Sequence, residues 1–404
     1  MPYKMFLKLL QENVKQGVLN LHLPQGESYR FGDQGLEAHW VINGEQTISR
    51  IARDWEYQLG ETYINGEWDV SDCELRDLLY ILRSNFAEYS ISKWLRPMAK
   101  IAHEWNKVSR SYNNVSQHYD LDASFFKLFL DKEMHYSCAY FPDRFTSLEQ
   151  AQAEKCRLIA RKLILKPGQK ILDIGCGWGS LAFNLAKYED IEIVGITLSK
   201  EQLVVAQQRA KELGIKNVQF KLQDYREHGG EYDRIVSVGM FEHVGKPYYH
   251  TYFECIQDLL KNDGVALIHT IGRSGPPGLT NPWIRQHIFP GGSVPSLSEM
   301  AKCVEDANLI STDIEVLRLH YAQTLREWLK RFQQNRAEIK QKMGEKFYRM
   351  WEFYLTICEV SFQFSDSVVY QLQLAKQHDV VPPTRDYLFT GEVNEAPIKI
   401  QKLM

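Results

Sequence analysis

Apolar and polar positions follow two alternating periods from about residue 150 onward. Short apolar runs are separated by longer stretches of helical periodicity, which is typical of a parallel sheet covered by helices. The pattern predicts helices at 148–165, 179–188, 200–213 and 247–260, and strands at 170–174, 191–197, 217–222, 232–239 and 264–271. We therefore expect an α/β fold, a doubly wound and mostly parallel sheet with helices on both faces.

The rest of the chain divides into segments of different character. Residues 1–90 mix short alternating runs with glycine turns and predict a small α+β domain, which is a candidate for lipid or dimer contact. Residues 91–115 predict a helical linker, and their basic side chains make contact with lipid headgroups the alternative interpretation. We expect the catalytic domain at 116–375, with a helical cap at about 272–375, and an irregular extension at 376–404.

Composition and charge indicate an ordinary globular protein. Of the 404 residues, 44% are hydrophobic and 25% are charged, and the net charge of −3 argues against a nucleic-acid-binding chain. The charge is unevenly distributed, with 7 Lys/Arg against 13 Asp/Glu in residues 1–80 and 8 against 3 in residues 322–350. The second segment is therefore a candidate surface for an anionic membrane.

Cysteine usage and hydropathy indicate the cellular compartment. The seven cysteines stand singly, without a C-x-x-C pair, which argues against a disulfide framework and against a zinc site. The N-terminal apolar stretch contains a charge and lacks a cleavage site, and no run of about 18 uncharged apolar residues occurs. We predict a cytoplasmic protein without a metal that contacts a membrane only peripherally.

A glycine-rich loop follows the first predicted strand of the α/β region. The sequence LDIGCGWG (172–179) places Gly175, Gly177 and Gly179 before a helix, where the backbone must turn sharply and approach a nucleoside ligand. The spacing G-x-G-x-G after Asp173 is typical of Rossmann-like class I S-adenosylmethionine-dependent methyltransferases, whereas dinucleotide-binding proteins carry G-x-G-x-x-G. We predict an S-adenosylmethionine site, with dinucleotide binding as a distant alternative.

Polar residues at the end of the second strand are candidate contacts for the ribose. Many methyltransferases carry an acidic residue here, but this chain has Thr197 and Leu198. Because a threonine hydroxyl lacks the charge of a carboxylate, we expect Gln202, on the first turn of the next helix, to be the better polar partner.

The end of the third strand carries candidate contacts for the adenine. Gln223, Asp224 and Tyr225 follow this strand directly. The Asp224 carboxylate is suited to accept from the adenine amino group, and Tyr225 is suited to cover the ring. The alternative for Asp224 is a turn or helix cap, which its position makes less favoured.

Six segments in the same order resemble the cyclopropane fatty acid synthases and their mycolic acid relatives. They are YSCAYF (136–141), LDIGCGWG (172–179), GITLSKEQ (195–202), QDYR (223–226), DRIVSVGMFEHVG (233–245) and LIHTIG (267–272). The similarity extends from about residue 55 to about residue 375. It implies methyl transfer from S-adenosylmethionine to a cis alkene of a phospholipid acyl chain, followed by proton loss and ring closure.

This chemistry needs orientation and a dry pocket. An alkene is a poor nucleophile, so the methyl donor must be held in line with it. The resulting carbocation must be kept from water, preferably among aromatic faces. Glu242 and His269 follow the fourth and fifth strands and are expected together at the crest of the sheet, although a buried Glu and His are often only a structural pair.

The resemblance also implies individual roles. Two residues close over the methionine part of the cofactor, Tyr136 and Ser137. Five hold a bicarbonate ion that removes the methyl proton, namely Cys138, Glu242, His269, Ile271 and Tyr321.

Cys358 corresponds to a cysteine that has been regarded as the nucleophile of the family. Methyl transfer to carbon needs no covalent enzyme intermediate, and Cys358 stands in an aromatic-rich helix. We therefore interpret it as a packing residue and keep a place in the pocket as the alternative.

Two other functions compete with this interpretation. One is an S-adenosylmethionine-dependent C- or N-methyltransferase for a small molecule, which the fold alone does not exclude. The other is a non-catalytic lipid-binding protein with a degenerate methyltransferase domain, which the intact glycine loop argues against. The partners we predict are a phospholipid bilayer with unsaturated chains and a second copy of this chain in a homodimer, with no nucleic acid.

Overall fold

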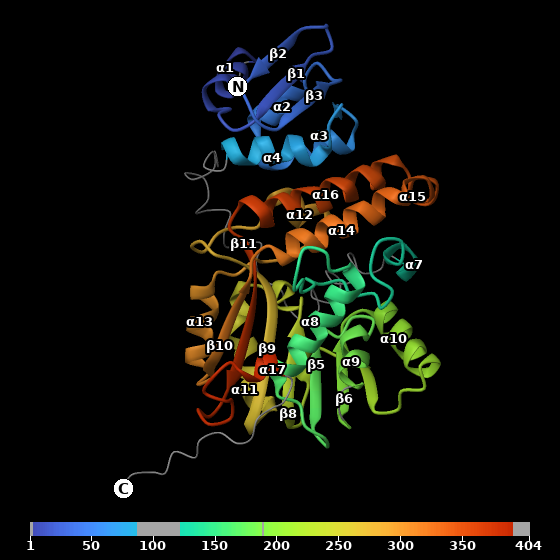
Figure 1. Cartoon of the computed structure of the whole chain (residues 1–404), viewed down its shortest axis with the longest axis vertical. Helices are drawn as coiled ribbons and strands as arrows, with labels where there is room; N and C mark the ends of the chain where they lie inside the picture. The colour runs from blue at the N-terminus through green and yellow to red at the C-terminus, as the bar shows by residue number, and fades with distance from the viewer. Residues whose placement is uncertain (1–2, 87–121, 188–189, 391–404) are drawn as a thin grey trace. The chain divides into compact units, whose positions relative to one another are not determined.

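The computed structural model describes residues 3–86, 122–187 and 190–390 (Figure 1). They form two compact units, each assembled from separate stretches of the chain. The smaller unit contains the described residues up to 86 together with 280–289 and 321–367. The larger unit contains the described residues from 122 to 279 together with 290–320 and 368–390.

The predicted domains were continuous segments, whereas both compact units are discontinuous. The boundaries at 1–90, 116–375 and 376–404 stay predictions. The predicted linker at 91–115 lies outside the described residues.

The larger unit is built on a seven-stranded sheet in the order β10-β11-β9-β8-β5-β6-β7. Its strands are β5 (Lys170–Ile174), β6 (Glu192–Thr197), β7 (Val218–Leu222), β8 (Tyr232–Val238), β9 (Leu260–Arg273), β10 (Ile310–Leu317) and β11 (Ser367–Ala375). The pairs from β9 through β8, β5 and β6 to β7 are parallel, and β10 with β11 is antiparallel. The mostly parallel, doubly wound sheet predicted from the sequence is confirmed.

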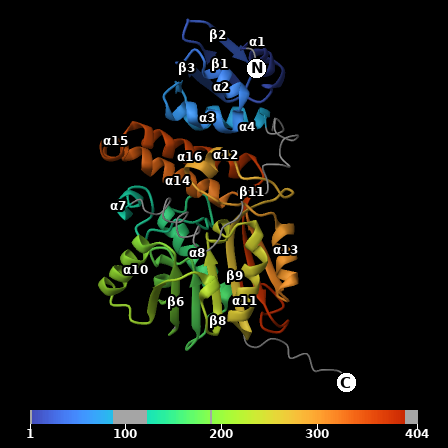
Figure 2. The same cartoon turned by 180° about the vertical axis from the view of Figure 1, so that it is seen from behind.

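Helices cover both faces of this sheet (Figures 1 and 2). Buried side chains of α8 (Leu148–Leu163), α9 (Ser180–Leu185) and α10 (Lys200–Glu212) form one core cluster with the strands. Those of α11 (Tyr249–Leu259) and α13 (Leu297–Asp306) form another. The remaining elements of this unit are α7 (Ala123–Phe126), α17 (Tyr387–Thr390) and the 3₁₀ turns η1 (Tyr225–Glu227), η2 (Phe241–His243) and η3 (Lys246–Tyr248).

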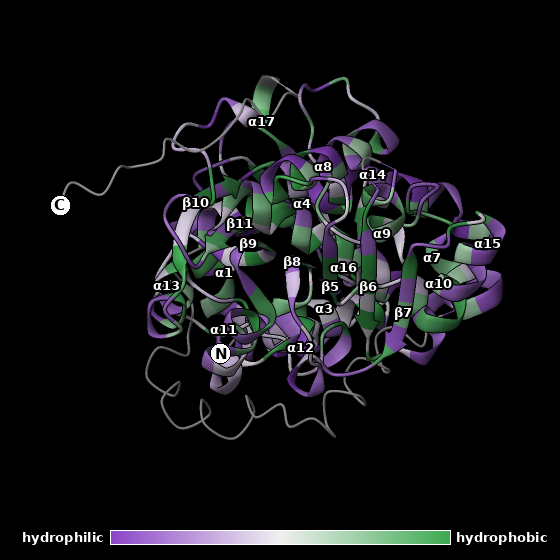
Figure 3. Cartoon of the chain, turned by 90° about the horizontal axis from the view of Figure 1, so that it is seen from below, coloured by the Kyte–Doolittle hydropathy of each residue, from purple (hydrophilic) through white to green (hydrophobic). Residues whose placement is uncertain are grey.

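Local sequence signals set the starts of these helices. Ser147 and Gln150 form a capping box at α8, and Ser199 caps α10 by accepting from the backbone N–H of Gln202. Figure 3 shows hydrophobic stretches along the central strands and bands of both colours on α10 and α13, as expected for amphipathic helices at a surface.

Every helix and strand predicted between residues 148 and 271 is present, with bounds that differ by a few residues. β10 and β11 were not predicted from the sequence, and both lie within the segment expected to form a helical cap. Long helices do follow in that segment, α14 (His320–Gln334), α15 (Arg336–Met343) and α16 (Glu345–Phe364).

The smaller unit combines these three helices with a four-stranded sheet in the order β2-β1-β3-β4. Its other elements are α1 (Tyr3–Asn13), β1 (Val18–His22), β2 (Ser28–Phe31), β3 (Glu37–Ile42), α2 (Thr47–Arg53), α3 (Trp55–Ile64), β4 (Trp68–Ser71), α4 (Leu75–Phe86) and α12 (Pro282–His287). Indole rings fill its core, with Trp40 and Trp68 5.7 Å apart at an edge-to-face angle. The α+β character predicted for the N-terminal residues is confirmed.

In the described parts of the chain, none of the helices has the length and hydropathy needed to cross a bilayer. The same residues contain no group of three or more His, Cys, Asp or Glu side chains arranged to hold a metal ion.

Candidate active site

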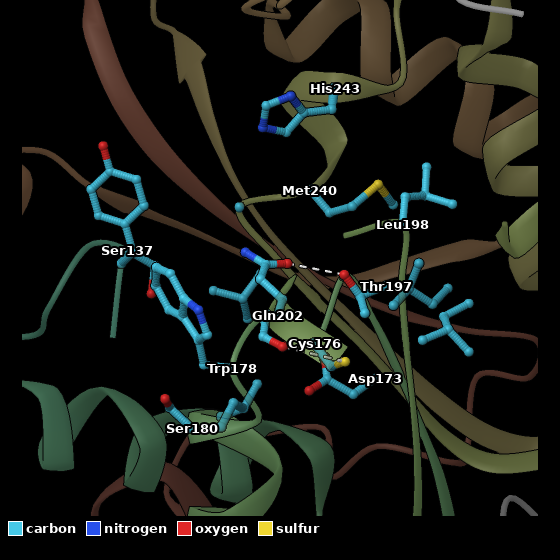
Figure 4. Close-up of a pocket in the computed structure, with 18 of the residues that line it drawn as sticks. Ser137, Asp173, Cys176, Trp178, Ser180, Thr197, Leu198, Gln202, Met240 and His243 are labelled. Carbon is cyan, nitrogen blue, oxygen red and sulfur yellow. Dashed lines mark hydrogen bonds between the residues drawn. The ribbon is translucent and has the colours of Figure 1, made fainter. Parts of the chain in front are cut away.

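A pocket lies at the carboxyl ends of the parallel strands in the larger unit (Figure 4). The loops after β5, β6, β7 and β8 contribute to it, together with the segment 134–137 and one side chain of α8. The carboxyl ends of a doubly wound sheet are the usual place for a ligand, because several loops meet there. Eleven of the twelve predicted cofactor residues line the pocket: Tyr136, Ser137, Asp173, Gly175, Gly177, Thr197, Leu198, Gln202, Gln223, Asp224 and Tyr225.

The glycine loop after β5 lines the pocket with backbone atoms, because Gly175 and Gly177 have no side chains of their own. The N–H groups of Gly175 and Cys176 both donate to the carbonyl of Ile196, at 2.9 and 3.0 Å, which holds the loop against β6. Gly177 has a φ of +55°, and a Cβ added there would meet no protein atom within 4 Å. The space above Gly177 therefore belongs to the pocket, and a side chain there would compete with a ligand.

The other two glycines of the loop serve its packing. A Cβ on Gly175 would approach the Met240 side chain to 2.7 Å, and one on Gly179 would approach Phe220 to 2.6 Å. Gly179 caps α9 and is the one predicted cofactor residue that does not line the pocket. Its role is thus to let the chain enter the helix at close range to its neighbours.

Asp173 is a buried carboxyl group without a hydrogen-bonding partner at Oδ2 among the described residues. Burial raises the pKa of Asp173 to about 7, and the positive charge of Lys155 opposes this rise. A buried carboxylate of this kind is stabilised by a cationic ligand group, and an ammonium group in the pocket would fit it.

The loop after β6 presents an amide and a hydroxyl instead of a carboxylate. Thr197 Oγ1 and Gln202 Oε1 are 2.9 Å apart, and Figure 4 shows the two side chains facing one another. Since Thr197 donates to Gln202, the amide nitrogen of Gln202 is left to donate to a ligand.

Asp224 is more firmly engaged with the protein than the sequence suggested. Its carboxylate accepts hydrogen bonds from Nε and Nη2 of Arg226, at 2.8 and 2.7 Å. It also accepts from the Arg226 backbone N–H and so caps η1. The cap that the sequence made the less favoured alternative is therefore present. Asp224 and the buried Tyr225 still line the pocket.

The predicted proton-removal residues divide between the two units. Cys138, Glu242, His269 and Ile271 belong to the larger unit, whereas Tyr321 belongs to the smaller one. Glu242 Oε1 accepts from the backbone N–H of Ile271 at 2.5 Å, so these two predicted residues are in contact. Glu242 Oε2 is buried and has no partner among the described residues.

Burial sets the protonation of Glu242 and His269 in opposite ways. It raises the pKa of Glu242 to about 7, although the Ile271 N–H favours the charged form. It lowers the pKa of His269 to about 3, helped by the positive charge of Lys155, so this imidazole is neutral. The Gln371 amide nitrogen lies 3.0 Å from His269 Nδ1, and with the amide in this orientation Nδ1 accepts the hydrogen bond and the ring proton is on Nε2.

The two predicted cysteines lie in different units and have different surroundings. Cys138 is buried, and its thiol donates to the Ala139 carbonyl at 3.3 Å. Burial raises the pKa of Cys358, in α16 of the smaller unit, to about 12, so its thiol stays protonated near neutral pH. This agrees with the interpretation of Cys358 as a packing residue.

Several pocket residues were missed by the sequence analysis. They are Met134, His135, Lys155, Cys176, Trp178, Met240 and His243, among others. His135 is held by Asp131 Oδ2 at 2.9 Å and by Cys156 Sγ at 3.3 Å, and all three side chains are buried. Lys155 had a detectable signal, because it stands on the apolar face of α8 at helical spacing from Ala151 and Ile159.

The strand order, the glycine loop after β5 and the pocket above it define a class I S-adenosylmethionine-dependent methyltransferase. The chain belongs to the mycolic acid cyclopropane synthetase family, whose model matches residues 106–372.

Individual relatives cover most of the chain. It is 37% identical to cyclopropane-fatty-acyl-phospholipid synthase of Escherichia coli over 370 residues, which are 88% of this chain and 95% of the relative. It is 33% identical to tuberculostearic acid methyltransferase UfaA1 of Mycobacterium tuberculosis, over 92% of this chain and 90% of the relative. The solved structure of mycolic acid cyclopropane synthase CmaA1 in complex with SAH and CTAB matches with a TM-score of 0.62 and 35% identity, over 65% of this chain and 97% of that chain.

Proposed function

We propose that this chain transfers a methylene group from S-adenosylmethionine to cis double bonds of phospholipid acyl chains and so forms cyclopropane fatty acids. The observation that carries the proposal is the similarity to cyclopropane-fatty-acyl-phospholipid synthase, which extends over 88% of this chain and 95% of that relative. A methyltransferase pocket with an adjoining group of buried polar residues supports it.

The pocket residues fit the parts of S-adenosylmethionine. The free space above Gly177 suits close approach of the ligand, and the unpartnered Asp173 carboxyl suits its ammonium group. Gln202 is placed to donate to the ribose, and Asp224 with Tyr225 to contact the adenine. When bound, the cofactor supplies an electrophilic methyl group on a sulfonium.

We further propose that the proton acceptor is a bicarbonate ion held by Cys138, Glu242, His269, Ile271 and Tyr321. The unpartnered Oε2 of Glu242 fits a donor group on such a ligand, and the Nε2–H of neutral His269 fits an acceptor. The ion would supply a base beside the methyl-bearing centre. Tyr321 stays a prediction for this role, since it lies in the smaller unit.

The experiment that tests the function is mass spectrometry of phospholipids from cells that express the protein, compared with cells that express the Asp173→Ala variant. We expect a gain of one CH₂ on unsaturated chains, resistance of the product to hydrogenation under conditions that reduce alkenes, and cyclopropane ring protons in the NMR spectrum. A methyl-branched product would keep the cofactor site but change the last step. Unchanged lipids together with methylation of a small molecule would contradict the proposal.

A peripheral association with phospholipid and a homodimer are part of this proposal. The exposed basic residues Lys330, Arg336 and Lys346 support the first. Arg349 does not contribute, because it is buried and paired with Asp69.

A further inference from the structure

Lys155 is a buried cation whose charge the protein does not neutralise by direct contact. Its side chain extends from α8 to the lining of the pocket, and the residue is 1% exposed. The only hydrogen bond it makes to the described residues runs from Nζ to the hydroxyl of Ser137, at 3.1 Å. No carboxylate in that part of the chain lies within 4 Å of Nζ.

This arrangement leaves a lysine with unsatisfied donors. An ammonium group has three N–H donors, and Ser137 accepts one of them. The nearby carboxylate of Asp131 is already used, because it accepts from the backbone N–H of Glu133 and from the backbone and ring of His135. A buried, unpaired charge is costly, so a site that keeps one is built to receive an opposite charge from a ligand.

A second lysine of the same helix shows the contrast. Lys162 has no exposed side-chain surface, and its Nζ lies 2.6 Å from Glu315 Oε2 and 3.6 Å from Asp313 Oδ2. Its charge is therefore neutralised within the protein, and it does not line the pocket. Of these two buried lysines, only Lys155 has its remaining donors available to the pocket.

Asp173 complements Lys155 across the pocket lining. The two charges are close enough for Lys155 to lower the pKa of Asp173, yet they do not form an ion pair within 4 Å. Groups of opposite sign that form no ion pair among the described residues thus line the same pocket, together with Ser137 and the glycine loop. An amino acid zwitterion, with one ammonium and one carboxylate group, has the matching pair of charges.

We propose that Lys155 binds the carboxylate of the amino acid part of the cofactor and that the Ser137 hydroxyl orients the ammonium group of Lys155. This inference rests on the proposed cofactor site and names the group that recognises one end of the ligand. The chemistry it requires is a carboxylate-type anion, which the cofactor carries and which bicarbonate resembles. The experiment distinguishes these two sources.

The test measures binding by titration calorimetry with two ligands, S-adenosylhomocysteine and its decarboxylated analogue, in which a hydrogen replaces the carboxylate. The variants are Lys155→Met and, as the matched control, Lys162→Met. Loss of a charged hydrogen bond predicts that Lys155→Met weakens binding of S-adenosylhomocysteine roughly 10- to 100-fold. We expect Lys155→Met to bind the decarboxylated analogue as wild type does and Lys162→Met to bind both ligands unchanged.

Several outcomes would overturn the proposal. If Lys155→Met bound S-adenosylhomocysteine with wild-type affinity, the proposal would be wrong. If that variant also needed more bicarbonate for activity, the anion bound by Lys155 would be bicarbonate. If Lys155→Met bound both ligands more weakly by the same factor, the role of Lys155 would be structural and the proposal would be wrong. Should Lys155→Met fail to fold, the wild-type protein still decides, because the proposal requires it to prefer S-adenosylhomocysteine over the analogue by a similar factor. Failure of the proposed function is a separate result, in which neither ligand binds the wild-type protein.

Discussion

The smaller unit surrounds its buried charged groups with protein partners, whereas the larger unit leaves two carboxyl groups, Asp173 and Glu242, without an ion pair among the described residues. Glu359 of the smaller unit also has an Oε2 without a partner among these residues, but its Oε1 is paired with both Arg76 and Arg326, so its charge is neutralised. In the smaller unit, Arg349 donates to the carbonyls of Tyr63 and Trp68 and to the carboxylate of Asp69. Both oxygens of Glu352 are also satisfied, by Tyr63, Gln333 and Tyr348. In the larger unit, Asp173 and Glu242 each retain a buried oxygen without a partner among the described residues.

The difference separates structural charges from functional ones. A buried charge whose partners are all protein groups stabilises one arrangement of the chain, and removing a partner costs stability. A buried charged group that lacks a protein partner lowers stability until a ligand supplies the missing hydrogen bond or opposite charge. Such groups have perturbed pKa values, and perturbed pKa values therefore mark functional sites. Substitutions at the two kinds of site should therefore have different effects, on activity or ligand binding in one case and on stability in the other.

The largest effect is expected at Glu242. Glu242→Gln removes the carboxylate while keeping the shape, and we expect activity to fall by roughly 10²- to 10⁴-fold because proton removal is impaired. Binding of S-adenosylhomocysteine and of lipid vesicles should remain within about twofold, since Glu242 does not line the cofactor pocket. Product formation by mass spectrometry measures the first quantity and calorimetry the second.

The control for this variant is Glu254→Gln, an exposed residue of α11 that should leave activity unchanged. Wild-type activity should also fall when dissolved carbonate is rigorously removed and recover on its addition. Full activity without carbonate would contradict the bicarbonate prediction and leave Glu242 itself as the base.

A paired charge should behave in the opposite way. Arg349→Met removes the partner of Asp69 and leaves the carbonyls of Tyr63 and Trp68 unsatisfied. We expect a loss of about 2–4 kcal/mol in the free energy of unfolding, measured by urea denaturation, because two buried carbonyl groups lose their donor while Asp69 is half exposed. Affinity for S-adenosylhomocysteine below the transition should be unchanged. The exposed pair of Arg30 and Glu37 provides the control, because Arg30→Met should cost less than about 1 kcal/mol.

Gly177 tests the open space in the pocket. Gly177→Ala places a Cβ where no protein atom stands, and we expect S-adenosylhomocysteine affinity to fall roughly 10- to 100-fold because the methyl group intrudes on the ligand. Gly214→Ala is the matched control, since Gly214 also has a positive φ and free surroundings but does not line the cofactor pocket. Both variants should lose about 1–2 kcal/mol of stability from backbone strain, and only the first should lose affinity. Equal ligand affinities for the two variants would refute close approach at Gly177.

Asp173 predicts a pH dependence of cofactor binding. Its pKa of about 7 in the folded protein lies above the ordinary value of 3.8, so the neutral carboxyl favours folding below pH 3.8 and this contribution is lost as pH rises through 7. A cationic ligand group selects the ionised form, so affinity for S-adenosylhomocysteine should rise roughly tenfold from about pH 6 to about pH 8, with proton release at the lower pH.

Calorimetry in buffers of different ionisation enthalpy measures both the affinity and the proton release. Asp173→Ala should abolish detectable binding, and Glu242→Gln should keep the pH dependence although the pKa of Glu242 is also about 7. A flat profile in the wild-type protein would exclude Asp173 as the partner of the ammonium group.

The smallest effect is expected at the exposed basic residues of 322–350. Each of Lys330→Gln and Arg336→Gln should weaken binding to vesicles containing anionic phospholipid by roughly fivefold, because a basic contact near a charged surface contributes about 1 kcal/mol. High salt should likewise weaken binding of the wild-type protein to these vesicles. Binding that is indifferent to salt and to lipid charge would leave apolar insertion as the main contact.

Much of the larger unit follows from short-range patterns in the sequence. The central parallel strands β5 and β6 are compact apolar runs, because a strand buried on both faces has no polar side, whereas β7 at the edge of the sheet alternates apolar and polar residues. The glycines of the loop after β5 have positive φ angles, a local backbone need that their sequence reveals. These features also identify the cofactor class. β10 is less distinct in the sequence, because it lies at the edge of the sheet and exposes several of its residues. β11 is buried, but Gln371 and Gln373 interrupt its apolar run.

Other features were decided by contacts between residues far apart in the sequence. Nothing near Lys162 in the sequence shows that it is paired with Glu315, and nothing near Lys155 shows that it lacks a carboxylate partner among the described residues. Nor does local pattern reveal that α14 to α16 join the compact unit of the N-terminal residues. The sequence by itself thus determined which side chains stand at the strand ends, since that depends on periodicity along one element. Which of those charges are left for a ligand was decided by the tertiary structure, because pairing depends on which side chains the fold brings within a few ångströms of one another.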